Sequence, residues 1–308
     1  MPAKPLSKAE LRAGLVAREP DDHKGVFGHV LVVAGSRGMS GAAILAARGA
    51  LRSGAGLVTV AAPASAASII AGAVPSAMTL ALPENAAGAF RPEGVDRLKE
   101  YARDRRVSTM AIGPGVTTHA DAAKFVLLAL AGVAAGAVVD ADALNILAAQ
   151  DKEGVREMLK SRKLPCVYTP HPAEASRLLG VRKGEIEGAR QASAEKLAKA
   201  LGGVVILKGK GSLISSGSRT VLNPTGGPAL AKAGSGDVLA GLVAGLWAQS
   251  VASGRVKGDP PFLAAALGAW LHGTAGDALA KEKTPWAASS TDLPECLPAA
   301  FKALCASR

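Results

Sequence analysis

Residues 29–61 read "HVLVVAGSRGMSGAAILAARGALRSGAGLVTVA", in which two short aliphatic runs are separated by a glycine-rich bend and an alanine-rich stretch. The runs at 29–34 and 57–61 have the length and the β-branched content of buried strands. The alanine-rich stretch between them is typical of a helix. A strand, a helix and a second strand in this order predict a parallel β–α–β unit, and therefore an α/β protein.

The same alternation continues along most of the chain. Further strands, each followed by a helical candidate, are predicted at 78–82, 108–112, 136–140, 165–169 and 203–207. The pattern then changes, because "SLISSGSRTVLNP" (212–224) predicts a β-hairpin that turns at Ser216 and Gly217. Long helices are expected at 236–249 and 261–280. We therefore expect a mainly parallel central sheet with helices on both faces and a hairpin towards its C-terminal end.

The composition favours a single domain. Hydrophobic residues make up 49% of the 308 residues and aromatic residues only 3%, so the core is expected to consist of small aliphatic side chains. No linker and no repeat interrupts the pattern, which predicts one domain over 1–308 with an N-terminal extension over 1–27. The extension has no apolar core of signal-peptide length, and the apolar runs elsewhere are too short to span a bilayer.

Charge and cysteine content narrow the class of partner. The net charge of +11 favours anionic partners, but the basic residues are scattered and no aromatics lie between them, so phosphorylated metabolites fit better than nucleic acid. Cys166, Cys296 and Cys305 form no CxxC motif and no His/Cys cluster, which argues against a disulfide framework or a structural zinc site. We expect a soluble protein of the reducing cytoplasm with no nucleic-acid or membrane partner.

Five loops carry the unusual residues, and each follows a predicted strand or opens a helix. In an open α/β sheet the ligand crevice lies beyond the carboxyl ends of the strands, so these loops should converge. The first, "AGSRGMSGAA" (34–43), could present N–H groups to an anion, but it matches neither a Walker nor a Rossmann fingerprint and could equally be a tight turn. The second, "IGPGV" (112–116), is by itself typical of a turn.

The third and fourth loops add polar side chains. In "VVDADALN" (138–145), Asp140 and Asn145 could hold a ligand hydroxyl or a hydrated magnesium ion, and Asp142 could equally be the N-cap of the next helix. In "TPHPAEASRLLG" (169–180), His171 lies between two prolines and is either a ligand contact or a satisfied surface histidine. The other four histidines show no metal-ligand spacing, which argues against a zinc hydrolase.

The fifth loop, "LKGKGSL" (207–213), ends a predicted strand. It supplies two lysine cations, and two glycines that let a ligand approach the backbone closely. This combination predicts a nucleotide-binding site. The residues concerned are Lys208, Gly209, Lys210, Gly211 and Ser212.

The stretch "AKAGSGDVLAG" (231–241) places Asp237 in the first turn of a helix, after Gly234, Ser235 and Gly236. Unpaired N–H groups at a helix start attract anions, and the same field favours an ionised carboxylate. A carboxylate beside such an anion hole is what phosphoryl transfer to a hydroxyl requires. The alternative is an ordinary helix cap with glycines for packing. Ala233 excludes a G-x-S-x-G hydrolase elbow around the serine.

Taken in order, these loops resemble the ribokinase-like superfamily, with its carbohydrate kinase-like domain, and within it the ADP-dependent NAD(P)H-hydrate dehydratases. The resemblance covers about 30 to 245 and implies a three-layer α/β fold. The stretches that carry it are "VLVVAGSRGMSGAAILAARGALRSGAGLVTV", "IGPG", "VVDADALN", "TPHPAEASRLLG", "LKGKGSLI" and "NPTGGPALAKAGSGDVLAG".

The resemblance implies a lyase that repairs (6S)-hydrated NADH and NADPH. ADP phosphorylates the ring hydroxyl, the ring nitrogen then helps to expel phosphate, and NAD(P)H and AMP are released. It further implies ADP as co-substrate, Mg²⁺ as cofactor, a homo-oligomer such as a tetramer, and a separate epimerase. The separate epimerase is expected because bifunctional relatives carry an epimerase domain ahead of the dehydratase, and fewer than 30 residues precede the first strand here.

The resemblance also assigns roles to particular positions. Asp237 would be the base on the substrate hydroxyl, and Gly234, Ser235 and Gly236 would form the anion hole. The remaining assignments are Ala42, Gly115 and His171 for the hydrated dinucleotide, Lys208 to Ser212 with Gly236 for the adenine nucleotide, and Asp140 with Asn145 as supporting residues.

Three residues of the stretch "NPTGGPALAKAGSGDVLAG" depart from the family pattern. Gly227 replaces the typical Asn, and Ala229 and Ala233 replace typical glycines, which would restrict the backbone near the phosphate. Two rival functions therefore stay open. One is a kinase of the same superfamily acting on a hydroxymethylpyrimidine, a thiazole alcohol or a sugar, and the other is a non-catalytic nucleotide-binding regulator.

Overall fold

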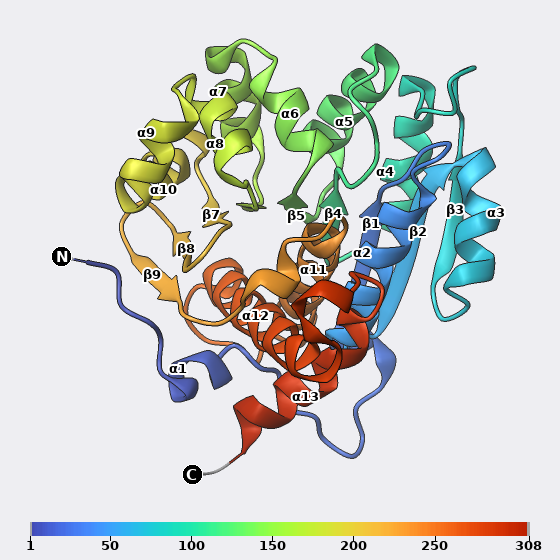
Figure 1. The fold of residues 1–308 in the computed structure, drawn as a ribbon. Helices are drawn as coiled ribbons and strands as arrows, with labels where there is room; N and C mark the ends of the chain where they lie inside the picture. The colour runs from blue at the N-terminus through green and yellow to red at the C-terminus, as the bar shows by residue number, and fades with distance from the viewer. Residues whose placement is uncertain (1, 307–308) are drawn as a thin grey trace.

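The predicted strands assemble into one sheet. In the computed structural model, which describes residues 2–306, nine strands lie in the order β3-β2-β1-β4-β5-β6-β7-β8-β9 (Figure 1). The strands are β1 His29–Val33, β2 Leu57–Pro63, β3 Met78–Leu82, β4 Thr109–Ile112, β5 Gly136–Val139, β6 Cys166–Tyr168, β7 Val204–Leu207, β8 Ser212–Ser215 and β9 Thr220–Asn223. Strands β1 to β7 are parallel, and β8 and β9 form the predicted antiparallel hairpin.

Helices cover both faces of the sheet. The α-helices are α1 Lys8–Arg12, α2 Ser40–Arg52, α3 Ala64–Ala73, α4 Val95–Asp104, α5 Ala120–Gly132, α6 Asp142–Ala148, α7 Lys152–Ser161, α8 Pro172–Leu179, α9 Lys183–Gly188, α10 Arg190–Leu201, α11 Ser235–Ser253, α12 Pro260–Ala287 and α13 Leu293–Cys305. Three 3₁₀ turns are η1 Lys24–Phe27, η2 Pro92–Gly94 and η3 Pro228–Leu230. Figure 1 shows α11, α12 and α13 (orange to red) on one side of the sheet and α4 to α8 (green) on the other.

Side chains alternate between the two faces of each strand, so the sheet has one hydrophobic core on each face. Val30 and Val32 of β1 pack with α2, α3, α11, α12 and α13, whereas Leu31 and Val33 pack with the layer that contains α4 to α8 and α10. Side chains of successive strand residues point to opposite faces, so a strand buried on both faces reads as a continuous aliphatic run. The three-layer α/β fold predicted from the sequence is confirmed.

The helices near the C-terminal end are longer than predicted. Helix α11 extends to Ser253, and α12 continues to Ala287 through a break at Thr284, whose φ is +62°. The chain ends in a further helix, α13. At the other end of the chain, Lys4 pairs with Val221 and so covers the edge strand β9. No helix within residues 2–306 is long and apolar enough to cross a membrane.

The five loops converge at the carboxyl ends of the parallel strands, as predicted. The strand order reverses between β1 and β4, and the loops after β1, β4, β5, β6 and β7 follow neighbouring strands from that point. Main-chain hydrogen bonds join them in pairs. Gly35 N–H donates to Pro114 O (2.8 Å), Asp140 N–H to Ile112 O (3.1 Å), and Lys208 N–H to Pro170 O (2.9 Å).

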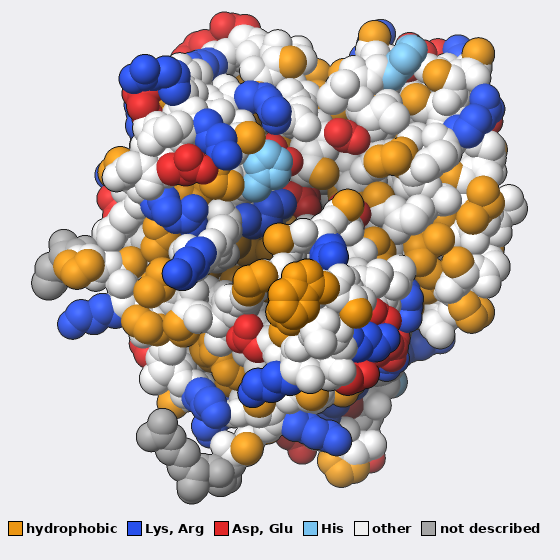
Figure 2. All heavy atoms as spheres, viewed as in Figure 1, with side chains coloured by type: hydrophobic (Ala, Val, Ile, Leu, Met, Phe, Trp, Pro, Cys, Tyr) orange, Lys and Arg blue, Asp and Glu red, His pale blue; other side chains and the backbone are white. Residues whose placement is uncertain are grey.

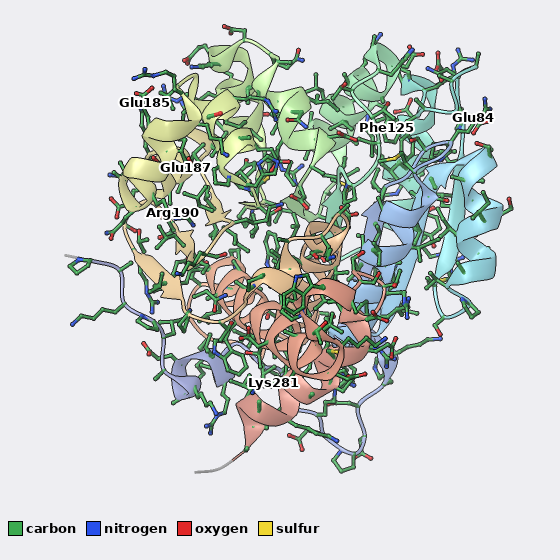
Figure 3. The ribbon with its side chains drawn as sticks, in the orientation of Figure 1. Glu84, Phe125, Glu185, Glu187, Arg190 and Lys281 are labelled. Atoms are coloured by element: carbon green, nitrogen blue, oxygen red, sulfur yellow. The ribbon has the colours of Figure 1, made fainter. Side chains whose placement is uncertain are left out.

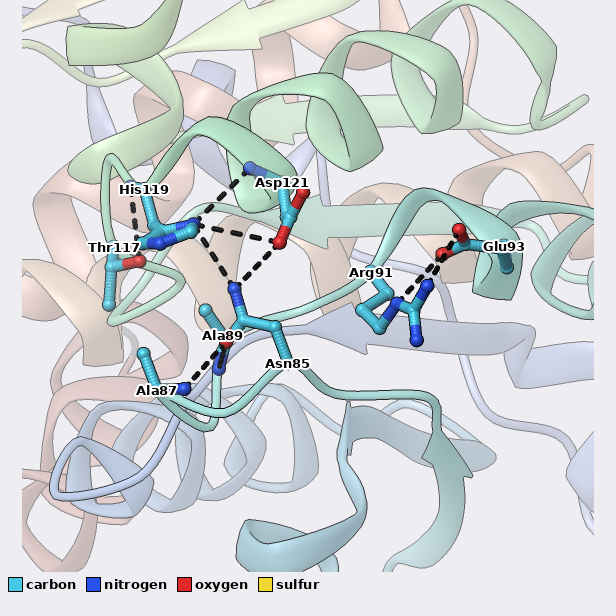
Figure 4. Close-up of polar contacts among 8 residues, drawn as sticks. All are labelled: Asn85, Ala87, Ala89, Arg91, Glu93, Thr117, His119 and Asp121. Carbon is cyan, nitrogen blue, oxygen red and sulfur yellow. Dashed lines mark hydrogen bonds and ion pairs between the residues drawn. The ribbon is translucent and has the colours of Figure 1, made fainter.

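A polar network holds the loop that follows β3, which is also hydrogen-bonded to the first crevice loop through Arg37 N–H and Gly88 O (3.1 Å). The Asn85 amide donates to Asp121 Oδ2 (2.8 Å) and contacts His119 Nδ1 (3.1 Å), while the Asn85 Oδ1 accepts from the N–H groups of Ala87 and Ala89 (Figure 4). His119 is the N-cap of α5. The network ties loop to helix, which gives this histidine a structural role.

Candidate active site

The site begins at the N-terminal end of α11. Gly234 is the N-cap with φ +89°, and Asp237 lies in the first turn, as predicted. A Cβ atom on Gly234 would lie 2.4 Å from Leu45 Cδ1 and 2.8 Å from Ser290 Oγ, so both its conformation and its surroundings require glycine. The first N–H groups of a helix have no intrahelical acceptor. The Ser235 N–H donates to the Lys232 carbonyl at 3.3 Å, and the other N–H groups of this turn form a potential anion hole.

An ion pair lies directly beside this helix start. Asp140 is 1% exposed, and its Oδ1 accepts from Lys208 Nζ at 2.8 Å. Lys208 Nζ is also 4.0 Å from Glu174 Oε2. A Cβ atom on Gly236 would lie 3.1 Å from Lys208 Nζ and 3.4 Å from Asp140 Oδ2. The structure therefore brings Asp140, Lys208 and the anion hole together.

Asp237 is surrounded by carboxylates. Its pKa is raised to about 7, chiefly by burial and next by the Asp140 charge; Lys208 acts in the opposite sense, and Asp142 and Glu174 add smaller increases. The helix field favours the ionised form of this side chain, but burial and the neighbouring negative charges act in the opposite direction. A carboxyl group with a pKa near 7 can accept a proton at neutral pH.

His171 and Glu174 form a reciprocal cap at the start of α8. His171 Nδ1 accepts from the N–H groups of Ala173 and Glu174, and Glu174 Oε2 accepts from the His171 N–H at 2.8 Å. Burial raises the pKa of the Glu174 carboxyl to about 6, although Lys208 acts against the shift. Burial also lowers the pKa of His171, and Lys208 adds to that effect. His171 is thus a capping residue whose neutral ring borders the site.

A cavity of about 740 Å³ opens beside these groups. Figure 2 shows the hollow in this face, with basic side chains and a histidine at its edge. Gly234 and Asp237 do not line it. Predicted residues that line it are His171, Lys208, Gly209, Lys210, Ser212, Ser235 and Gly236. Gly211 does not line it, but φ +62° at this residue shapes the turn. The rest of the wall includes the stretch from Asn223 to Lys232 and part of α12.

Ala42 and Gly115 meet each other at the point where the strand order reverses. A Cβ atom on Gly115, whose φ is +63°, would lie 3.0 Å from Ala42 Cβ, and the Gly115 carbonyl accepts from Ser36 Oγ at 2.9 Å. Neither residue lines the cavity. Two of the three residues predicted for the dinucleotide therefore lie together outside the cavity, whereas the third, His171, lines the cavity with Lys208.

Asn145 and Asp142 are engaged with protein groups. Asn145 Oδ1 accepts from Arg177 Nη1 at 2.8 Å, and Asp142 Oδ2 accepts from the Thr117 N–H at 2.9 Å. The alternative that Asp142 is an N-cap is wrong, because Ala141 occupies that position with φ +52°. Within residues 2–306 there is no cluster of three His, Cys, Asp or Glu side chains that could hold a metal ion. The side chains present therefore do not form a dedicated metal cage.

His272 was not predicted for the site. It lies on α12, is 8% exposed, lines the cavity, and its Nε2 is 2.8 Å from the carbonyl oxygen of Ser235. Burial lowers its pKa to about 4, with a smaller opposing effect from the Ser235 hydrogen bond. A carbonyl only accepts, so the neutral ring donates from Nε2 and fixes the anion-hole turn to α12. In the sequence this residue appeared only as a histidine without metal-ligand spacing.

The departures in the glycine-rich stretch cause no backbone strain. Gly227 has φ −137°, and neither Ala229 nor Ala233 is among the residues with positive φ. Any L-residue can adopt such conformations. The backbone conformation at these positions therefore does not require glycine.

Comparison with known proteins agrees with this geometry. The family model for NAD(P)H-hydrate dehydratase matches residues 30–299. A bifunctional NAD(P)H-hydrate repair enzyme of Moorella thermoacetica is 42% identical over 95% of this chain, which spans only 53% of that protein. The ADP-dependent (S)-NAD(P)H-hydrate dehydratase of Neisseria meningitidis is 37% identical over 85% of this chain and 81% of its own length.

Solved structures agree as well. An ADP/ATP-dependent NAD(P)H-hydrate dehydratase from Bacillus subtilis, co-crystallised with ATP and Mg²⁺, matches with a TM-score of 0.80 and 29% identity over 99% of both chains. A hydroxyethylthiazole kinase from Pyrococcus horikoshii matches with a TM-score of 0.54 and 17% identity over 94% of this chain and 93% of its own. The second match supports the ribokinase-like fold alone. The chain belongs to the NAD(P)H-hydrate dehydratase family.

Proposed function

We propose that this protein uses ADP to dehydrate (6S)-hydrated NADH and NADPH, restoring NAD(P)H and releasing AMP and phosphate. The observation that carries the proposal is Asp237, whose pKa is about 7 and which lies at an anion hole beside the Lys208 cavity, in a chain of this family. A base with a pKa close to the working pH is suited to take a proton from a hydroxyl.

In the proposed mechanism, the ring hydroxyl attacks the β-phosphorus of ADP and gives its proton to Asp237. The N–H groups from Gly234 to Gly236 would stabilise the charge on the transferred phosphoryl group. The ring-nitrogen lone pair then helps to break the bond between carbon 6 and oxygen. Loss of a proton from carbon 5 restores the double bond. The products are NAD(P)H, AMP and phosphate.

The nucleotide and the dinucleotide would occupy different parts of the crevice. Lys208 to Ser212 and Gly236 are proposed to hold ADP in the cavity, while Ala42 and Gly115 contact the hydrated dinucleotide, with Asp140 and Asn145 in support. His171 lines the ADP side of the crevice, so it would touch the substrate only where the two ligands meet. Mg²⁺, which proteins usually hold through substrate phosphates and one or two carboxylates, would enter with the nucleotide and neutralise phosphate charge.

A cytoplasmic location, assembly into a tetramer and a separate epimerase that supplies the (6S) substrate belong to the same proposal. They are motivated by the family and by the unpaired cysteines, of which Cys166 and Cys296 are buried. We also propose that residues 1–308 form one domain. The single sheet within residues 2–306 supports this proposal. Light scattering of the purified protein measures the oligomer directly.

One assay separates the three candidate functions. The protein is incubated with NADH hydrate, Mg²⁺ and either ADP or ATP, and absorbance of the reduced nicotinamide ring is followed. We expect recovery of absorbance that requires the nucleotide. No recovery, together with phosphorylation of a thiazole alcohol or hydroxymethylpyrimidine, would favour the kinase. Nucleotide binding without either reaction would favour the regulator.

The pKa of Asp237 predicts the pH dependence of this reaction. Raising the pH through about 7 deprotonates the proposed base, so kcat/KM for the hydrate should rise with pH and level off above 7. Well below that value the increase should be about tenfold per pH unit. Glu174, with a pKa of about 6, is the control. Glu174→Gln should keep the rise and move it only slightly to lower pH, because Glu174 is the smallest contributor to the raised pKa of Asp237. Loss of the rise in this variant would assign the titration to Glu174.

A further inference from the structure

The turn that follows β7 is held by an arginine from another element. Arg190, the first residue of α10, donates from its guanidinium to the carbonyl oxygens of Leu207 (3.3 Å), Lys208 (3.4 and 3.5 Å) and Gly211 (3.3 Å). A Cβ atom on Gly209 would lie 2.7 Å from Arg190 Nη1. Figure 3 labels Arg190 beside the β7 and β8 strands. One side chain thus touches most of the turn predicted to seat the nucleotide.

The guanidinium of Arg190 is hydrogen-bonded to these carbonyls, and within residues 2–306 it forms no ion pair with a carboxylate. The acidic side chain three residues earlier, Glu187, is paired with Lys183 at 3.2 Å and acts on Arg190 only through its charge. Arginine can bridge several acceptors because its planar guanidinium carries five N–H donors in a fixed fork. The cation therefore contributes to the field at the turn.

Peptide geometry determines what the turn presents to the cavity. In a trans peptide the C=O of one residue and the N–H of the next point in opposite directions. The Lys208 and Gly211 carbonyls point at Arg190, so the N–H groups of Gly209 and Ser212 point away from it. Ser212 is paired with Asn223 of β9, and because Leu222 N–H donates outward to Lys4 O, the Ser212 N–H belongs to the sheet. Gly209 therefore supplies the N–H that is left for a ligand. Gly209 and Ser212 both line the cavity. The Gly209 carbonyl is itself occupied, because Ser212 Oγ donates to it at 3.1 Å.

We propose that Arg190 is a positioning residue that turns the carbonyls of Leu207, Lys208 and Gly211 away from the cavity and leaves the Gly209 N–H facing it, so that this wall selects an anionic group. That group would be a phosphate of the nucleotide, an assignment that rests on the proposed function. Without the guanidinium, at least one carbonyl can rotate inward and repel the phosphate. Discrimination between charged and uncharged nucleosides should then fall.

The test compares the binding of AMP and adenosine by calorimetry in three variants. Arg190→Gln should weaken AMP binding by about tenfold or more, since it removes hydrogen bonds to a charged group that orient the turn, while adenosine affinity changes little. Arg190→Lys retains the charge but cannot span three carbonyls, so its AMP affinity should be intermediate. Arg182→Gln, which removes an exposed arginine of the same region, is the matched control and should retain the AMP-to-adenosine ratio.

A fourth variant, Gly209→Ala, reaches the same contact from the other side. Gly209→Ala places a Cβ atom against Arg190 Nη1 at a residue with φ +139°, and it should also lower the AMP-to-adenosine ratio. Equal losses for AMP and adenosine, or an Arg190→Gln ratio equal to that of the control, would overturn the proposal. An unchanged KM for the hydrate together with a raised KM for ADP would support it. A different outcome would separate the two proposals. If Arg190→Gln loses the preference for AMP over adenosine but the wild-type protein does not convert NADH hydrate, the positioning role of Arg190 holds and the proposed function is wrong.

Discussion

Asp237→Asn is expected to lower turnover of NADH hydrate by about 10² to 10⁴, the usual cost of removing a general base. Asparagine keeps the size of the side chain but cannot take the hydroxyl proton. The phosphate-binding N–H groups belong to the backbone of the same turn, so ADP affinity should stay within about threefold, well under the tenfold that 1.4 kcal/mol represents. Single-turnover kinetics with saturating ADP measure the chemical step separately from binding.

The same substitution should stabilise the folded protein at neutral pH. Aspartate has an unfolded pKa of about 4, and the folded value is raised to about 7 by burial and by Asp140. The folded state therefore binds the proton more tightly, and the wild-type protein loses stability as pH rises from 4 through 7. The asparagine of the variant carries no such charge. The gain should be absent near pH 4 and reach about 1 to 2 kcal/mol above pH 7, after allowance for solvent screening.

Asp121→Asn is the matched control, because Asp121 also lies in the first turn of a helix but belongs to the network around Asn85. This variant should keep wild-type turnover and show no gain in stability above pH 7. Near-normal turnover in Asp237→Asn would assign the base to another group. Lost turnover without the pH-dependent gain in stability would instead show that Asp237 does not carry the raised pKa.

Most of the fold could be predicted from local sequence patterns. Continuous aliphatic runs such as 29–34 identified strands buried on both faces, and Ser216 with Gly217 identified the hairpin, where Gly217 has φ +87°. These signals depend only on neighbouring residues. The end of α12 was missed because Thr284 breaks the helix and Pro285 lies after the break, a feature that helical spacing does not reveal.

The site was predictable where glycines and helix starts mark it. Gly234 to Asp237 and Lys208 to Ser212 are read from short stretches, and the structure brings them together. Electrostatics were not predictable, because the pKa of Asp237 depends on Asp140, nearly 100 residues earlier in the chain. Arg190 and His272 were missed for the same reason. Each acts by bonding to main-chain carbonyls of another segment, and a carbonyl leaves no signal in the sequence.

The buried ion pair gives the second large effect. Lys208→Met should destabilise the protein by about 3 to 5 kcal/mol, the typical cost of leaving a buried charge without its partner. Asp140 is 1% exposed and would lose its 2.8 Å contact, while Glu174 would lose its nearest cation. Methionine is similar in shape to the lysine stem, so the loss reports mainly the charge. Chemical denaturation at pH 7 gives the free energy of unfolding.

Lys210→Met is the matched control, since Lys210 lies in the same turn, lines the same cavity and is exposed. It should change the unfolding free energy by no more than about 0.5 kcal/mol, as is usual for surface positions. It should weaken ADP binding in a salt-dependent manner, because an exposed charge is screened. Equal stability of the two lysine variants would show that the Asp140 pair is not buried as described.

Adding Asp140→Asn to Lys208→Met separates the structural role of the ion pair from its binding role. Removing both charges eliminates the unpaired carboxylate, so most of the lost stability should return, and the double-mutant cycle should show strong coupling. ADP affinity should not return, because the cation beside Gly236 is still absent. Stability recovered without affinity would mean that Lys208 serves both the fold and the nucleotide. Affinity recovered along with stability would restrict Lys208 to holding Asp140 in place and leave phosphate binding to the backbone of the two turns.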